Sequence, residues 1–229
     1  SADTSTATIT NIETVNIVFD TLTAATIDAA GISSASTINA SNVRAGSGAA
    51  LTVTNITDGS TLSISDFNTV TNATADAGGD LTLNANSATT NVRGTVSTDG
   101  VLTVNAAAAT GTVRGDSATG DVTINGAAAT VLTANSTSGD ITVTGAANAN
   151  VDAVSTAAGN ITVTTALADD VVATTTGAGT VTATGEGDTA MTVTARTSTV
   201  TLSANDAVNN ATVTATGTGA GVESDTLNV

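Results

Sequence analysis

Apolar and polar residues alternate along most of this chain in short runs that return about every 20 residues. Gly139-Asp140-Ile141-Thr142-Val143-Thr144 is one such run, and Gly120-Asp121-Val122-Thr123-Ile124-Asn125 is the run before it. Alternation over four to six residues predicts β-strands, and a fixed period of this length predicts a repeat architecture. The first apolar positions of successive runs follow at steps of 19, 21, 20, 19, 20, 20 and 19 residues: Leu62, Leu81, Leu102, Val122, Ile141, Ile161, Val181 and Val200.

A second, weaker strand is predicted between successive runs. Its first apolar residue follows the first strand by 10 or 11 residues, as Val92 follows Leu81 and Val171 follows Ile161. Each repeat therefore contains two short strands and two turns. Gly, Asp, Asn and Ser gather at the turns, where they tolerate positive φ or form hydrogen bonds with their own backbone.

Two architectures place a strand every ten residues: a pair of immunoglobulin-like sandwiches and a β-solenoid. In this chain one strand sequence returns at every second strand, which a sandwich does not require. A sandwich also normally fills its core with aromatic residues, whereas this chain has two Phe and no Trp or Tyr. The pattern favours an all-β, parallel β-helix-like solenoid of about 20 residues and two strands per coil. Within a coil, Ile141 and Val143 should point inward and Thr142 and Thr144 outward.

The regularity of the pattern changes along the chain. Residues 1–42 are less regular and are predicted to form the first coils as an N-terminal β segment, while residues 43–229 carry the regular repeats. The sequence ends within a strand-like run, Asp225-Thr226-Leu227-Asn228-Val229, so we expect it to be part of a longer chain.

The charge balance restricts the partners. There are 20 acidic residues against four Arg, which gives a net charge of −16, and the chain contains no Lys, His or Cys. Nucleic acid and anionic lipid are bound through Lys and Arg, so neither is an expected partner, and no apolar run is long enough for membrane insertion. Without His, Cys, Lys or Tyr the usual catalytic groups are missing, and we expect no enzyme activity. Strong acidity with abundant Thr and Asn fits an exported protein of a bacterial surface.

Acidic residues at equivalent turns are the candidate metal ligands. In a solenoid, turn residues of adjacent coils lie ~5 Å apart, and carboxylates this close favour a cation between them. Calcium prefers carboxylate and carbonyl oxygens in flexible loops. Solvent-exposed carboxylates that merely form good turns are the alternative. One column of equivalent turn positions contains Asp80, Asp121 and Asp140, and Asp99 lies one residue out of step with it. Two further candidates, Glu186 and Asp188, lie in a glycine-rich turn.

Two further groups of residues are predicted to line up on the outside of the coils. Thr-x-Thr and Thr-x-Asn pairs should form ranks on one flat face, which is similar to ice-binding solenoids but also typical of any exposed strand. Arg93 and Arg114 fall on consecutive second strands. They could bind carboxylates of a neighbouring subunit or pair locally with Asp99 or Asp116. Arg114-Gly115-Asp116 also spells the integrin-binding tripeptide, which this composition produces by chance.

A family resemblance adds to these expectations. A resemblance to bacterial surface-layer and repeats-in-toxin (RTX) exoproteins is carried by a short motif, Thr10-Asn11 followed by Ile12-Glu13-Thr14-Val15-Asn16-Ile17. The strands that follow this motif in such proteins are similar to Ser36-Thr37-Ile38-Asn39-Ala40-Ser41. The resemblance is strongest over residues 8–65. It implies a calcium-dependent β-solenoid, exported without an N-terminal signal peptide and assembled into a surface lattice or fibre. The calcium-binding nonapeptide of such proteins is not repeated here; Gly78-Gly79-Asp80-Leu81 and Gly185-Glu186-Gly187-Asp188 are fragments of it.

The sequence therefore predicts an extracellular structural protein of a bacterial cell surface. It would self-assemble as a homo-oligomer into a lattice or fibre with calcium, and another region would contact cell-surface polysaccharide. An extender or binding segment of a large adhesin is one alternative. An ice-binding solenoid that uses its Thr-x-Thr face is the other.

Overall fold

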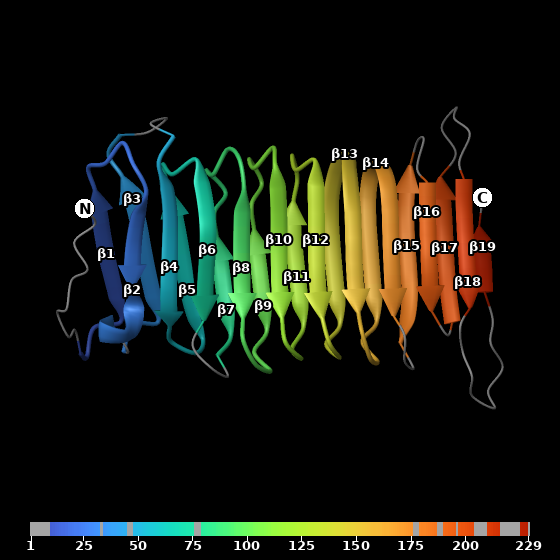
Figure 1. The fold of residues 1–229 in the computed structure, drawn as a ribbon, viewed down its shortest axis with the longest axis horizontal. Helices are drawn as coiled ribbons and strands as arrows, with labels where there is room; N and C mark the ends of the chain where they lie inside the picture. Colours follow the sequence, from blue (N-terminus) through green and yellow to red (C-terminus); the bar gives the residue numbers. More distant parts are fainter. Residues whose placement is uncertain are drawn as a thin grey trace.

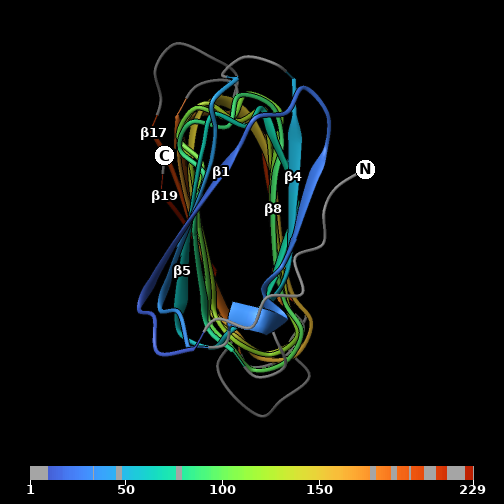
Figure 2. The same cartoon turned by 90° about the vertical axis from the view of Figure 1, so that its left-hand side faces the viewer.

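The chain winds into a β-solenoid. The computed structural model describes residues 10–32, 34–44, 48–75, 79–175, 179–186, 190–195, 197–203, 210–215 and 225–228. Each coil of about 20 residues contributes two strands to two parallel sheets, which confirms the predicted fold class. The strands stand side by side along a rod (Figure 1), and the view along the rod shows a flattened oval with a sheet on each long side (Figure 2).

The first sheet contains the strands that carry the repeated run of the sequence. Every pairing in it is parallel, and each strand pairs with its counterpart in the next coil. Its strands are β1 (Thr14–Phe19), β3 (Thr37–Asn42), β5 (Ser60–Ser65), β7 (Leu81–Asn84), β9 (Leu102–Asn105), β11 (Val122–Gly126), the first parts of β13 (Ile141–Ser155) and β14 (Ile161–Thr175), β15 (Thr180–Glu186), β17 (Thr197–Ser203) and β19 (Asp225–Asn228).

The second sheet contains the intervening strands, also in parallel register. Because β13 and β14 continue through the corner between the sheets, the hydrogen-bonded network is continuous. The other strands of the second sheet are β2 (Ala25–Asp28), β4 (Ala50–Ile56), β6 (Thr69–Ala75), β8 (Val92–Val96), β10 (Thr112–Ser117), β12 (Val131–Ser136), β16 (Ala190–Ala195) and β18 (Asn210–Ala215).

The core is the thin space between the two sheets. Ile141 and Val143 are buried while Thr142 and Thr144 are exposed, as the alternation predicts. At two positions large side chains of the first sheet face glycines of the second. Gly94 and Gly115 pair on adjacent strands, and a β-carbon on Gly94 would lie 3.0 Å from side-chain atoms of both Leu102 and Val104. Glycine at these positions leaves room between the sheets for the branched side chains that fill the thin core, as close packing of the interior requires.

The coil register differs from the series read from the sequence at two positions. Leu62 lies opposite Leu83 rather than Leu81, and Val200 lies opposite Ala183 rather than Val181. Equating Leu62 with Leu81 and Val200 with Val181 was therefore wrong by two residues. A shift of two leaves every side chain on the same side of the sheet, so the alternation alone does not reveal it. The second-strand prediction is correct. Val92 lies opposite Val113, and Val151, Val171 and Met191 lie opposite one another; Leu132, which the spacing did not identify, connects the two groups.

Glycines recur at the corner that precedes the first-sheet strands from β7 to β15, and their role differs from the expected one. Positive φ among the described glycines occurs at Gly48 and Gly59, and not in this corner column. The column is glycine because adjacent coils approach closely there. A β-carbon on Gly139 would lie 2.7 Å from the amide nitrogen of Asp121 and closer still to the carbonyl of Gly120. We call this corner, from Gly79 to Gly179, the glycine corner.

The first coils are longer than the later ones. Thr14 lies opposite Thr37, and Thr37 opposite Thr61, at steps of 23 and 24 residues. The first of these coils contains a short 3-10 helix, η1 (Ala29–Ile32), which lies at one end of the oval in Figure 2. The two Phe side chains meet edge to face at a centroid distance of 5.6 Å: Phe19 on β1 and Phe67, which is buried.

Candidate functional site

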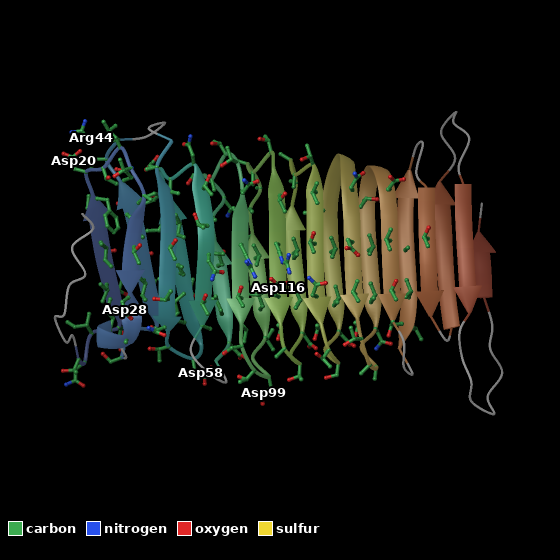
Figure 3. The ribbon with its side chains drawn as sticks, in the orientation of Figure 1. Asp20, Asp28, Arg44, Asp58, Asp99 and Asp116 are labelled. Atoms are coloured by element: carbon green, nitrogen blue, oxygen red, sulfur yellow. The ribbon has the colours of Figure 1, made fainter. Side chains whose placement is uncertain are left out.

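The predicted metal ligands lie along the glycine corner. Asp80, Asp121 and Asp140 each directly precede a first-sheet strand and are exposed, and Val101 takes this place in the coil that follows Asp80. Asp99 lies two residues before Val101, so it belongs to the same corner but not to the same column. Figure 3 places Asp58 and Asp99 on this edge of the rod. We call Asp58, Asp80, Asp99, Asp121 and Asp140 the acidic corner.

Most of these carboxylates join one coil to the next through one oxygen. Oδ1 of Asp80 accepts the backbone N–H of Val101 at 2.7 Å, and Oδ1 of Asp121 accepts that of Asp140 at 2.8 Å. Asp140 repeats the contact with the N–H of Asn160 at 2.7 Å. The close approach of coils at the glycines makes these bonds possible. Oδ2 of each carboxylate makes no hydrogen bond within the described residues, and this oxygen is available to a cation.

Two further residues belong to this pattern. Asp58 extends it by one coil, because its Oδ1 accepts the N–H of Asp80 at 2.9 Å. Asn160 continues it at the other end, since its Oδ1 accepts the N–H of Thr180 at 3.0 Å. Asn160 shows that an amide serves this structural role as well as a carboxylate.

The remaining predicted ligands stay predictions. Asp188 and the side chain of Glu186 lie outside the described residues. Among the described residues, no three acidic side chains come close enough together to surround one metal ion. Any calcium at the acidic corner would therefore need ligands from more than this column, such as carbonyl oxygens, water or a second molecule.

A column of buried hydroxyls supports the corner from inside. Oγ of Ser136 donates to the carbonyl of Gly120 at 2.9 Å and accepts the N–H of Gly139 at 2.9 Å. Ser117 forms the same pair of bonds with Gly100 and Gly120. Each hydroxyl thus connects two coils and satisfies polar atoms that water does not reach. Sequence reasoning missed this column, although Ser-x-x-Gly recurs at the repeat period.

The outer side of the second sheet carries an ionic cluster around Asp116. The predicted stacking of the two arginines is confirmed, since Arg93 lies opposite Arg114 on adjacent strands. Asp116 accepts hydrogen bonds from Nη2 of Arg93 at 3.1 Å, from Nε of Arg114 at 2.7 Å and from Nδ2 of Asn135 at 2.8 Å. The predicted local pairing with Asp116 is therefore present, and binding of these arginines to carboxylates of a neighbouring subunit stays a prediction.

These contacts shift the ionisation of both partners. Burial alone would raise the pKa of Asp116, but hydrogen bonds from Arg114 and Asn135 and the charges of Arg114 and Arg93 outweigh it, and the pKa lies below its usual value. The hydrogen bond to Asp116 raises the pKa of Arg114. Gly115 is buried within β10, so the Arg-Gly-Asp tripeptide is part of a strand whose carboxylate is already engaged.

The outer side of the first sheet carries the predicted ranks of Thr and Asn. Thr123, Thr142, Thr162 and Thr182 lie opposite one another, and Thr144 lies opposite Thr164. Amides take the second rank in the earlier coils, where Nδ2 of Asn105 donates to Asn84 at 2.8 Å and Nδ2 of Asn125 donates to Asn105 at 2.7 Å. The side chains of this sheet therefore form ordered ladders along the rod.

A shallow groove borders the first sheet at the corner opposite the acidic one. It has a volume of about 220 Å³ and is lined by small and amide side chains, including Asn105, Ala107, Asn125 and Ala127.

No helix in the described part of the chain is long and apolar enough to cross a membrane. No family model matches the chain, and no curated protein and no solved structure matches it.

Proposed function

We propose that this β-solenoid repeat protein is a structural subunit of a bacterial cell surface that self-assembles into a layer or fibre with calcium. One observation carries the proposal: the recurring polar side chains connect each coil to the next instead of converging on a cleft. Asp121, Ser136 and Asn105 all bond across coils in this way. Such contacts make a stiff rod whose stability is a sum of neighbour-to-neighbour terms, which suits a mechanical role.

Calcium would act at the acidic corner. The carboxylates of Asp121 and Asp140 lie on adjacent coils and are exposed, and one oxygen of each is taken by a backbone amide. The remaining oxygens form a row of negative charge along one edge of a chain whose net charge is −16. Calcium bound to this row from two copies would reduce their mutual repulsion and join them, because calcium accepts oxygen ligands from several sources in a flexible geometry.

The test removes the charge of the corner without removing its hydrogen bonds. In the double variant Asp121→Asn and Asp140→Asn, each side-chain oxygen still accepts the next amide, as Asn160 does in the native chain. Assembly is followed by electron microscopy and sedimentation while calcium is titrated and then removed with EGTA. We expect the wild type to assemble with calcium and to dissociate in EGTA, and the double variant to need at least tenfold more calcium.

A matched control removes two carboxylates elsewhere. Asp66, at the opposite corner, and Asp152, on the second sheet, are both exposed, and their replacement by Asn gives the same net charge as the corner variant. This control should assemble like the wild type. The calcium hypothesis is refuted if assembly and thermal stability of the wild type ignore EGTA, or if both double variants behave alike.

Ice binding is a second candidate function, supported by the flat ranks of Thr on the first sheet. Thr142, Thr162 and Thr182 are exposed and in register on adjacent coils, so their hydroxyl and methyl groups repeat at the ~4.8 Å strand spacing. A protein that binds ice through this face would show thermal hysteresis. Freezing curves indistinguishable from those of a matched buffer and an unrelated acidic protein would remove this candidate.

A further inference from the structure

We infer that the outer side of the first sheet is the contact face between two copies of this chain in the assembly. We call it the neutral face and define it as the outward residues from Thr37 on β3 to Thr184 on β15. The inference rests on the proposed self-assembly and adds which surface makes the contact. Its partner is the neutral face of a second copy.

Charge is distributed unequally between the two sheets. Every outward strand position of the neutral face is Thr, Asn or Ser, although the chain has 20 acidic residues and four Arg. The outward side of the second sheet has the same strand geometry but carries six charged residues: Asp28, Arg93, Arg114, Asp116, Asp152 and Asp170. Strand formation therefore does not require the neutrality of the first sheet.

Neutrality matters because two copies repel each other. Each copy carries a net charge of −16, and like charges brought together in an interface oppose association. Between Thr37 and Thr184 the neutral face lets two rods approach without placing carboxylates of outward strand positions against one another. The acidic corner lies along the edge of this face, since Asp121 and Asp140 directly precede β11 and β13. Calcium at that edge would then sit beside the contact.

The side chains of the neutral face are already ordered before any contact forms. Asn84, Asn105 and Asn125 are linked by hydrogen bonds of 2.8 Å and 2.7 Å, and Asn39 donates to Asn16 at 2.8 Å. Thr residues are branched at Cβ and have few rotamers on a strand. An ordered face loses little conformational entropy on docking, and that cost otherwise opposes association.

The area of the face suits a weak contact that is repeated. Eight strands at ~4.8 Å spacing extend over ~35 Å, and strands of about five residues over ~15 Å, which gives roughly 500 Å² per copy. A stable dimer buries about 800 Å² per partner, so one pair of copies should associate weakly. Many copies in a lattice, each held by several such contacts, gain strength through effective concentration.

Two glutamates on each sheet give a matched pair of variants. Thr142→Glu with Thr182→Glu charges the neutral face, and Thr133→Glu with Thr192→Glu charges the second sheet by the same amount. Each pair leaves at least one coil between the new carboxylates. The concentration at which assembly begins in calcium is measured by sedimentation, and circular dichroism checks the fold. We expect the neutral-face variant to require at least tenfold more protein and the control to stay within twofold of the wild type.

Single cysteines provide a second readout, because the chain has no native cysteine. Thr162→Cys on the neutral face should form disulfide-linked dimers under mild oxidation in calcium, and Thr192→Cys on the second sheet should not. Assembly that tolerates the neutral-face charges, or equal cross-linking of both cysteines, overturns the inference but leaves the proposed function standing. A wild type that stays monomeric with and without calcium overturns both. Thermal hysteresis that disappears in the neutral-face variant while assembly persists identifies ice as the partner of this face.

Discussion

Replacing Gly139 by Ala tests the packing that makes the coils stack. Alanine normally stabilises an extended segment relative to glycine by about 0.5–1 kcal/mol, because it restricts the unfolded chain. At Gly139 the added methyl group would lie 2.7 Å from the amide nitrogen of Asp121 and closer still to the carbonyl of Gly120. Real Cβ atoms do not approach backbone this closely, so the two coils must separate locally by roughly 1 Å to reach an ordinary contact of ~3.3 Å.

The cost follows from the bonds that span this gap. Ser136 donates to the carbonyl of Gly120 at 2.9 Å, Asp140 N–H donates to Asp121 at 2.8 Å, and Val122 N–H donates to the carbonyl of Asp140 at 2.9 Å. An extension of about 1 Å takes all three beyond hydrogen-bonding distance. At about 0.5–1.5 kcal/mol each, their loss destabilises the native state by roughly 3 kcal/mol.

Urea unfolding followed by circular dichroism measures this loss, and amide exchange localises it to the coils around Gly139. Gly59→Ala is the matched control, because Gly59 has a φ of +71° and no atom lies near its missing β-carbon. Backbone strain alone should cost the control about 1–2 kcal/mol. The close approach of the coils at Gly139 is refuted if the unfolding free energy of Gly139→Ala lies within 1 kcal/mol of the wild type. It is also refuted if Gly139→Ala is no more destabilising than Gly59→Ala.

Two more predictions concern buried and half-buried polar groups. Ser136→Ala should lose about 1–3 kcal/mol of unfolding free energy, because it leaves two polar backbone atoms without a partner, whereas exposed Ser138→Ala should stay within ~0.5 kcal/mol. Asp116→Asn should cost roughly 1–2 kcal/mol at neutral pH. The pKa of Asp116 is lowered in the folded state, so this stabilisation is present above the ordinary value of ~3.9 and is lost as the pH falls through the folded pKa. Urea unfolding measures the difference in unfolding free energy between the wild type and Asp116→Asn. A difference that does not decrease in acid contradicts this role of the Asp116 carboxylate.

The fold class and the inward and outward sides of the strands could be predicted from the sequence. Its 20-residue period predicted stacked coils, and alternation placed Ile141 inside and Thr142 outside. The same alternation could not fix the register of Leu62 or Val200, because a shift of two residues preserves every inward and outward position. Where strand lengths and turns vary, hydrogen bonding between whole strands decides which residues meet.

The roles of the corner residues could not be predicted, because they arise from contacts between stacked coils. Sequence alone explained glycine by its backbone freedom and Asp121 by turn formation or metal binding. The stacked coils show that Gly139 provides room, that Ser136 bonds two coils, and that Asp121 accepts the amide of Asp140. These roles depend on atoms 16 to 19 residues away that stacking brings within 3 Å. Composition and local pattern contain no information on such distances.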